Sequence, residues 1–140
     1  MGSVESPPAP GRINMITLHT DQYADMRRFY SEQLGMTIVS EIGEFVEFAS
    51  EGIRLTLTSR AGLNTSVPSA SLVNPRSGSA VGIGFYYQTA EEVDQAYECY
   101  MSQGVSFVAA PKQQEWGEYT AFFTDPDGNV HELVAVVQSA

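Results

Sequence analysis

The residues with the clearest chemical potential are Glu132 and His131, neighbours in the mostly apolar run 130–137. A strand sends alternate side chains to opposite faces, so Glu132 shares a face with three valines while His131 points the other way with Leu133 and Ala135. A carboxylate on such a face is either solvated at a rim or held in a cavity, where it can bind a cation or act as a general base. We interpret His131 as a packed or surface histidine.

His19 and Glu47 are the other candidate donors, because alternation places each on a strand face that can share a cavity with Glu132. A displaced divalent-metal site of His19, Glu47 and Glu132 is one reading, since such sites need about three oxygen or nitrogen donors. In metal-free catalysis, Glu132 or His19 would be the base. The sequence has no nucleophile–histidine triad spacing and no phosphate-binding glycine loop, and its single Cys99 cannot form an internal disulfide.

Turn residues and periodicity predict the elements that position these side chains. The sequence DPDGN at 125–129 predicts a tight turn between two strands, with Pro126 and Gly128 supplying its special backbone angles. Upstream we expect a strand at 14–20 and a helix at 22–34 that Asp21 caps and Gly35 ends. Three strands at 37–41, 44–48 and 53–59 precede a long loop rich in Ser, Gly, Asn and Pro at 60–80.

The same order then repeats. We expect a strand at 80–88, a helix that begins after Thr89 and ends at Gly104, a strand at 105–109, a loop at 111–117 and the final hairpin. Thr89 and Glu92 have the spacing of a capping box. The prediction is therefore an α+β domain at 13–137, with a first module at 13–59, a linker at 60–79, a second module at 80–137 and a disordered leader at 1–12.

Composition limits the partners. A net charge of −10 argues against nucleic acid and anionic membranes, and it permits a cationic ligand. No apolar run approaches the ~20 residues of a membrane span, and the N-terminus lacks a signal-peptide core. We therefore expect a cytoplasmic protein with a small-molecule partner.

The repeat, together with Phe29-Tyr30, Leu34-Gly35, Trp116-Gly117 and the DPDGN turn that closes on Glu132-Leu133, resembles the vicinal-oxygen-chelate superfamily. This superfamily includes glyoxalase I, bleomycin-resistance proteins, extradiol dioxygenases and fosfomycin-resistance enzymes. The resemblance covers residues 13–137 and implies two βαβββ modules with cupped mixed sheets around a ligand cavity. It also implies a homodimer.

The resemblance further implies where a divalent metal would be held in the enzymatic members. The matching positions are Met15, Thr56, Gly82 and Glu132, and only Glu132 retains a metal-ligand type. We therefore expect no metal and no cofactor, with a metal-dependent lyase, isomerase or dioxygenase of the glyoxalase type as the alternative.

The favoured function is binding without metal, as in the bleomycin-resistance branch, where a planar compound would be sequestered in the cup and antibiotic resistance would follow. Glu132 and Glu47 would pair with a cationic ligand, whereas Arg54 would pair with an acid or neutralise one of the two carboxylates. The glycines at 82 and 84 leave room for a flat group. The predicted ligand-binding residues are Met15, Thr17, His19, Phe45, Glu47, Arg54, Thr56, Tyr86, Trp116, Phe122 and Glu132.

Overall fold

The computed structural model describes residues 8–74 and 78–136 and contains two four-stranded sheets. Sheet one has the order β1-β4-β3-β2, and sheet two has the order β5-β8-β7-β6. In each sheet the first and last strands of the module pair in parallel and the remaining pairs are antiparallel. The strands are β1 (Met15–Thr20), β2 (Ile38–Ile42), β3 (Phe45–Phe48), β4 (Arg54–Ser59), β5 (Gly84–Tyr87), β6 (Ser106–Gln113), β7 (Glu118–Thr124) and β8 (Val130–Val136). The predicted α+β fold with two βαβββ modules is confirmed.

Each module carries one long helical segment between its first two strands. In the first module α1 (Tyr23–Arg28) continues into a π-helical turn, η1 (Phe29–Gln33). The N-cap position is Gln22, without a side-chain cap, so the prediction that Asp21 caps this helix is wrong. Asp21 instead forms an ion pair with Arg60, a long-range contact that a local capping pattern cannot reveal.

The second helix, α4 (Ala90–Ser102), begins as predicted. The hydroxyl oxygen of Thr89 accepts a 3.1 Å hydrogen bond from the backbone N–H of Glu92, which satisfies one donor of the first helical turn. Gly104 follows the helix with a φ of +87°, a conformation that favours glycine.

The linker differs from the prediction of a long loop. It contains two short helices, α2 (Arg60–Ser66) and α3 (Ala70–Val73). Ser59 and Ser69 cap them by accepting hydrogen bonds from backbone N–H groups of the first turn. Serine-rich composition is therefore typical of helix starts as well as loops. Residues 75–77 of the linker lie outside the described residues, as do 1–7 of the expected leader and 137 at the end of the second module.

Two strands of sheet two also differ in length from the prediction. β6 extends through Pro111 to Gln113, although the sequence predicts a loop from 111. It is an edge strand whose pairing with β7 shifts register twice, and both features tolerate a residue without a backbone N–H. β5 starts only at Gly84. Just before it, the carbonyl oxygen of Ile83 accepts the backbone N–H of Glu132, but the N–H of Ile83 donates to Nδ1 of the His131 side chain instead of to a backbone carbonyl of β8.

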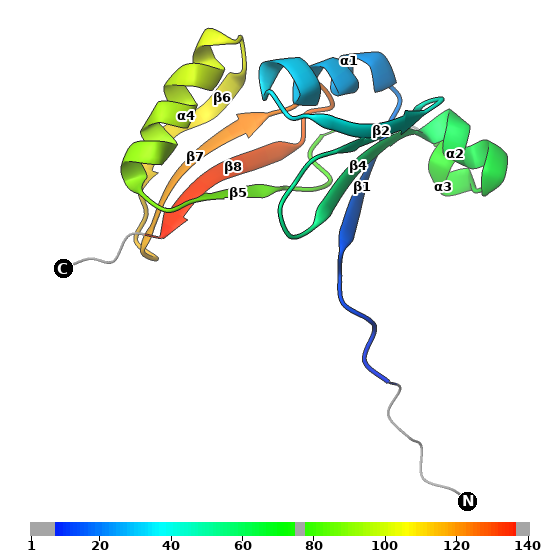
Figure 1. The fold of residues 1–140 in the computed structure, drawn as a ribbon, viewed down its shortest axis with the longest axis horizontal. Coiled ribbons are helices and arrows are strands. Elements are labelled where there is room, and N and C mark those ends of the chain that lie inside the picture. The colour runs from blue at the N-terminus through cyan, green and yellow to red at the C-terminus, as the bar shows by residue number, and fades with distance from the viewer. Residues whose placement is uncertain (1–7, 75–77, 137–140) are drawn as a thin grey trace, which may run out of the picture.

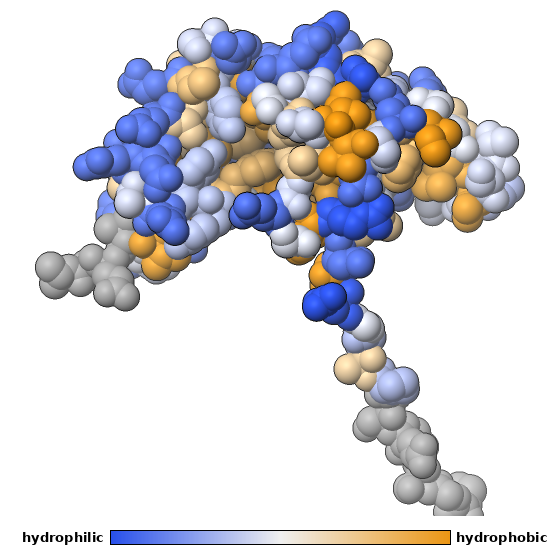
Figure 2. Space-filling model, viewed as in Figure 1, coloured by the Kyte–Doolittle hydropathy of each residue, from blue (hydrophilic) through white to orange (hydrophobic). Residues whose placement is uncertain are grey.

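The helices α1 and α4 lie on the same side of the two sheets (Figure 1). One continuous core forms beneath them, and it joins the modules: the ring of Phe29 lies 6.4 Å from that of Phe123. Along β8, His131, Leu133 and Ala135 are buried while Glu132 alternates with them, as predicted. We call the sheet surface opposite the helices the cup face. In Figure 2 apolar residues show between the two modules, while mostly polar residues cover α1 and α4. Within the described residues, no helix is long and apolar enough to cross a membrane.

Candidate ligand-binding site

Two cavities lie along the seam where the edge strand of sheet one meets the segment that leads into β5. The apolar slot has a volume of about 250 Å³, and the polar cavity has a volume of about 240 Å³. Both are lined by residues of β1 on one side and of the 78–85 segment on the other. A ligand in either cavity would therefore contact both modules.

Aliphatic and aromatic side chains and glycine backbone line most of the apolar slot. Its two glycines have different reasons to lack a side chain. A Cβ on Gly82 would lie 2.8 Å from the carbonyl oxygen of Val130, so the close approach of two backbones requires glycine there. A Cβ on Gly84 would make only ordinary contacts, the nearest being 3.6 Å from Oε1 of Glu132. The slot is lined by Ile16, Ser50, Ile53, Arg54, Leu55, Gly82, Ile83, Gly84 and Phe85.

Glu132 does not itself line the slot, but its carboxylate lies next to Gly84, which does. Its partner across the parallel β5–β8 pair is Gly84, and its Oε1 occupies the space next to that glycine. Burial raises the pKa of the Glu132 carboxyl, and the negative charge of Glu118 raises it further. The carboxylate forms no ion pair with any residue in the described ranges 8–74 and 78–136. Glu132 therefore presents a partly desolvated negative charge without a counter-ion.

Arg54 and Glu47 neutralise each other at the other side of the slot. Nη2 of Arg54 donates to Oε1 of Glu47 at 2.7 Å, and Nε donates to Oε2 at 3.1 Å. The Arg54 guanidinium holds the pKa of Glu47 below its usual range. This two-point contact engages both carboxylate oxygens, so Glu47 is not left to coordinate a metal.

The metal positions implied by the resemblance do not fit a divalent ion. Thr56 is fully buried, and its hydroxyl lies 2.6 Å from that of Thr17. Met15 and Gly82 offer no oxygen or nitrogen side-chain donor, which leaves Glu132 alone. Among the described residues, no three His, Cys, Asp or Glu side chains come together in a metal-binding group. The displaced set of His19, Glu47 and Glu132 is therefore not assembled.

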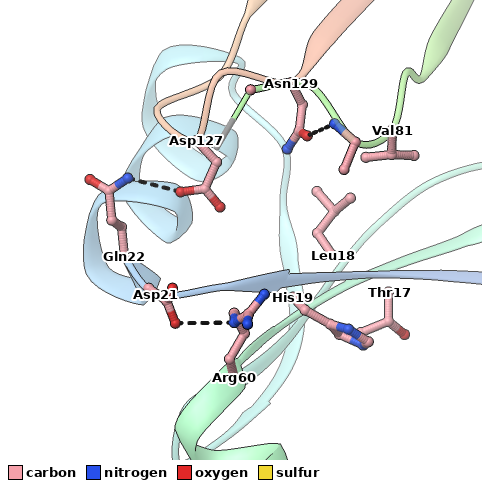
Figure 3. A pocket seen from close by; sticks show the side chains of 11 residues that line it. Thr17, Leu18, His19, Asp21, Gln22, Arg60, Val81, Asp127 and Asn129 are labelled. Atoms are coloured by element: carbon pink, nitrogen blue, oxygen red, sulfur yellow. Dashed lines mark hydrogen bonds and ion pairs between the residues drawn. The ribbon is translucent and has the colours of Figure 1, made fainter. Parts of the chain in front are cut away.

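His19 lines the polar cavity rather than the slot (Figure 3). Asp21 and Gln22 continue this wall beyond β1, and Arg60 reaches it from the start of α2. Asp127 and Asn129 of the β7–β8 turn lie across from them (Figure 3). Oδ1 of Asp127 accepts a 2.9 Å hydrogen bond from Nε2 of Gln22, which ties the turn to the first module.

None of the predicted aromatic residues lines the slot. Tyr86 is 66% exposed and pairs across the sheet with Val134, on the cup face. Trp116 is 64% exposed, and its Nε1 donates a 2.7 Å hydrogen bond to Oε1 of Glu118. Phe45 and Phe122 are half-buried. These residues, with Met15 and Thr17, stay predictions as ligand contacts.

Sequence reasoning missed most of both cavities. Ile53 and Leu55 have the alternation of core residues, yet they line the slot because the strand passes the seam between the modules. The charged residues of the polar cavity are separated by up to 106 positions (127 − 21), and no local pattern brings them together. They are Asp21, Arg60 and Asp127. The signal available was the type of residue, because Arg60 is one of only two charged residues in the linker 60–79.

Two cupped βαβββ modules joined along a seam with ligand-sized cavities define the class of protein. The sequence profile of the Glyoxalase/Bleomycin resistance protein/Dioxygenase superfamily matches residues 12–133. The chain belongs to this superfamily. No curated protein matches it.

Solved structures show the same fold. A glyoxalase/bleomycin resistance protein/dioxygenase from Nocardioides is 24% identical with a TM-score of 0.85, over 96% of this chain and 89% of that one. A family enzyme from Burkholderia phytofirmans PsJN is 19% identical with a TM-score of 0.75, over 91% and 100%. A lactoylglutathione lyase from Agrobacterium tumefaciens is 22% identical with a TM-score of 0.69, over 91% and 95%. At these identities the similarity concerns the fold.

Proposed function

We propose that this chain binds a flat organic cation without a metal ion, with the ring system in the apolar slot and the positive charge at Glu132. The observation that carries the proposal is the carboxylate of Glu132, which is partly desolvated, has no counter-ion among residues 8–74 and 78–136, and lies beside Gly84. An unpaired carboxylate in such a place costs stability, and a bound cation would remove that cost.

The shape of the slot supports a planar ligand. Its volume of about 250 Å³ is close to that of a molecule with roughly two or three fused rings, and its walls are mainly apolar. The missing side chain at Gly84 lets a ring approach the backbone next to the carboxylate. Tyr86 on the cup face would offer a ring face for cation–π contact, as would Trp116, whose indole N–H donates to the carboxylate of Glu118.

The charges around the slot favour a cation over an anion. The guanidinium of Arg54 is engaged by Glu47 through two hydrogen bonds, so it contributes little net positive charge. Glu132 and Glu118 both belong to the cup face of sheet two and leave it negative. An anionic ligand would have to enter against this field.

Fluorescence titration with three flat probes tests the proposal. The probes are proflavine, which is a cation, acridone, which is neutral, and anthracene-9-carboxylate, which is an anion. Trp116 is the single tryptophan, so its quenching reports on the cup face. We expect proflavine to bind about tenfold more tightly than acridone and the anion to bind weakest.

Charge-matched variants localise the site. Glu132→Gln should weaken proflavine binding by about tenfold or more, because it removes the charged partner while keeping the side-chain shape. Glu98→Gln, an exposed position on α4, changes the net charge equally and should leave binding unchanged. Equal affinity of the two variants, or equal affinity of wild type for proflavine and acridone, would contradict the assignment.

A metal-dependent enzyme of the glyoxalase type is the alternative, and the name of the Agrobacterium relative illustrates that chemistry. The donor set argues against it, since Glu132 is the only ligand-type side chain at the four implied positions. Calorimetric titration with Mn²⁺, Ni²⁺, Zn²⁺ and Fe²⁺ separates the two. Micromolar binding that Glu132→Ala abolishes would replace our proposal with the enzymatic one.

Metal-free catalysis by Glu132 is a second candidate, favoured by its raised pKa, because a base works best with a pKa closer to neutrality. His19 lines the other cavity and would not share this role. Mass spectrometry of a ligand after incubation distinguishes catalysis, which changes its mass or connectivity, from binding, which does not.

We also propose that the chain is a homodimer and that sequestration serves resistance. Tyr86 is exposed on the cup face and Trp116 is exposed in the β6–β7 turn, and a second copy would cover these rings. Light scattering should give twice the monomer mass. Expression in a sensitive bacterium should raise the tolerated bleomycin concentration in the wild type but not in Glu132→Gln.

A further inference from the structure

We propose that the polar cavity is a second binding site, separate from the slot, for a small zwitterion of amino-acid size. Its carboxylate would pair with Arg60 and its ammonium with Asp127. The two groups come from different modules, so the ligand would bridge the seam.

Arg60 is the reason to expect an anionic group. The residue is only 4% exposed, and it lines the cavity from the first position of α2. Its Nη2 donates to the carbonyl oxygens of Ser71 and Asn74. Its Nε has no hydrogen-bond partner among the described residues, although Oδ1 of Asp21 lies 3.3 Å away. A buried guanidinium whose donors are not all satisfied is costly unless an anion completes its contacts.

Asp21 is the counter-ion of Arg60 in the absence of a ligand, and it can be displaced. Its side chain is 65% exposed, whereas that of Arg60 is 5% exposed. Most of the carboxylate of Asp21 is therefore in water, and moving it away from Arg60 costs little. A ligand carboxylate that forms a two-point contact with the guanidinium would displace it.

Asp127 is the reason to expect a cationic group in the same ligand. It projects from the β7–β8 turn on the opposite wall from Arg60 (Figure 3). Burial raises the pKa of its carboxyl group. Gln22 donates one hydrogen bond to its Oδ1, and no ion pair of Asp127 exists among the described residues.

The combination selects a zwitterion. A simple anion at Arg60 would also face the carboxylates of Asp21 and Asp127, and a simple cation at Asp127 would face Arg60. A molecule that carries both charges can pair its anionic group with Arg60 and its cationic group with Asp127. The volume of about 240 Å³ lies below that of typical drug-sized pockets and suits a small metabolite.

Calorimetry on the full chain tests this with glycine, β-alanine and γ-aminobutyrate, which separate the two charges by increasing distances. Acetate and methylammonium are the single-charge controls. We expect at least one zwitterion to bind about tenfold or more tightly than either control. The absence of saturable binding by all three zwitterions up to about 10 mM would overturn the proposal.

Two variants assign the charges without removing the buried arginine. Asp127→Asn preserves an acceptor for Gln22 and should abolish the advantage of the zwitterion over acetate. Asp21→Asn removes the competing carboxylate and should tighten binding of both acetate and the zwitterion by several-fold. The assigned orientation would be refuted if Asp127→Asn still bound the zwitterion more tightly than acetate by the wild-type factor. It would also be refuted if Asp21→Asn bound acetate and the zwitterion more weakly than wild type does. Circular dichroism at the titration temperature verifies that both variants are folded.

Discussion

The hydroxyl of Tyr30 donates a 2.7 Å hydrogen bond to Oδ2 of Asp125, and this buried contact joins the helical segment of the first module to the turn of the second. Nε2 of His131 lies 3.0 Å from the same oxygen. Nδ1 of His131 accepts the backbone N–H of Ile83, so the ring proton is on Nε2 and faces Asp125. The histidine beside Glu132 is therefore structural: it holds the seam that both cavities share.

Removing this hydroxyl should weaken the junction. Tyr30→Phe leaves a buried carboxylate with one donor fewer, and we expect the free energy of unfolding to fall by about 1–3 kcal/mol. Tyr97→Phe is the matched control, because no hydrogen bond of that hydroxyl is found among the described residues. Chemical denaturation of both variants measures the difference, and a similar loss in Tyr97→Phe would contradict the assigned role.

Stability should decline in acid because of Asp125. Burial alone would raise the pKa of this carboxyl, but hydrogen bonds from His131, Asn129 and Tyr30 outweigh burial and hold it below the usual value. A lowered folded-state pKa contributes stability above the unfolded-state value of about 3.9, and that contribution is lost as the pH falls further. Denaturation midpoints from pH 6 to about pH 2 should decline less steeply in Asp125→Asn than in wild type. If the denaturation midpoints of wild type and Asp125→Asn declined equally with pH, Asp125 would not be the source of the acid sensitivity.

Glu132→Gln should change stability in the opposite direction, raising it at neutral pH. Burial raises the pKa of this carboxyl, so its ionised form destabilises the fold at neutral pH, and the penalty disappears as the pH falls through the raised value. We expect the variant to melt at a higher temperature than wild type at pH 7 while binding proflavine less well. Such a trade-off is typical of residues kept for function. A lower melting temperature would indicate a structural role, and Glu98→Gln should leave it unchanged.

The two slot glycines should respond differently to alanine. Gly82→Ala would place a Cβ 2.8 Å from the carbonyl oxygen of Val130, so backbone must move and stability should drop by about 1–3 kcal/mol. Gly84→Ala makes contacts of 3.6 Å or longer and should fold normally while narrowing the slot. Thermal unfolding and proflavine titration of the pair separate the structural glycine from the ligand-facing one. Equal destabilisation would show that both are required by the fold.

Local chemistry in the sequence predicted much of the fold correctly. The DPDGN turn forms because the carboxylate of Asp125 accepts the backbone N–H groups of Asp127 and Asn129, and Gly128 adopts a positive φ. Alternation along β8 placed Glu132 and His131 on opposite faces, and the cap at Thr89 started α4. Each of these features depends on residues within a few positions of one another, so the sequence contains all the information they need.

The tertiary structure decided what those residues meet. The pKa of Glu132 is raised by burial against the neighbouring strand and by the charge of Glu118. The cavity that Arg60 lines is closed on its other side by a turn more than 60 positions away (125 − 60 = 65). The side chains that line the slot also follow from how one module packs against the other. Periodicity specifies which face a side chain occupies, whereas the seam arises from the sum of many contacts between distant segments, and no local spacing encodes that sum.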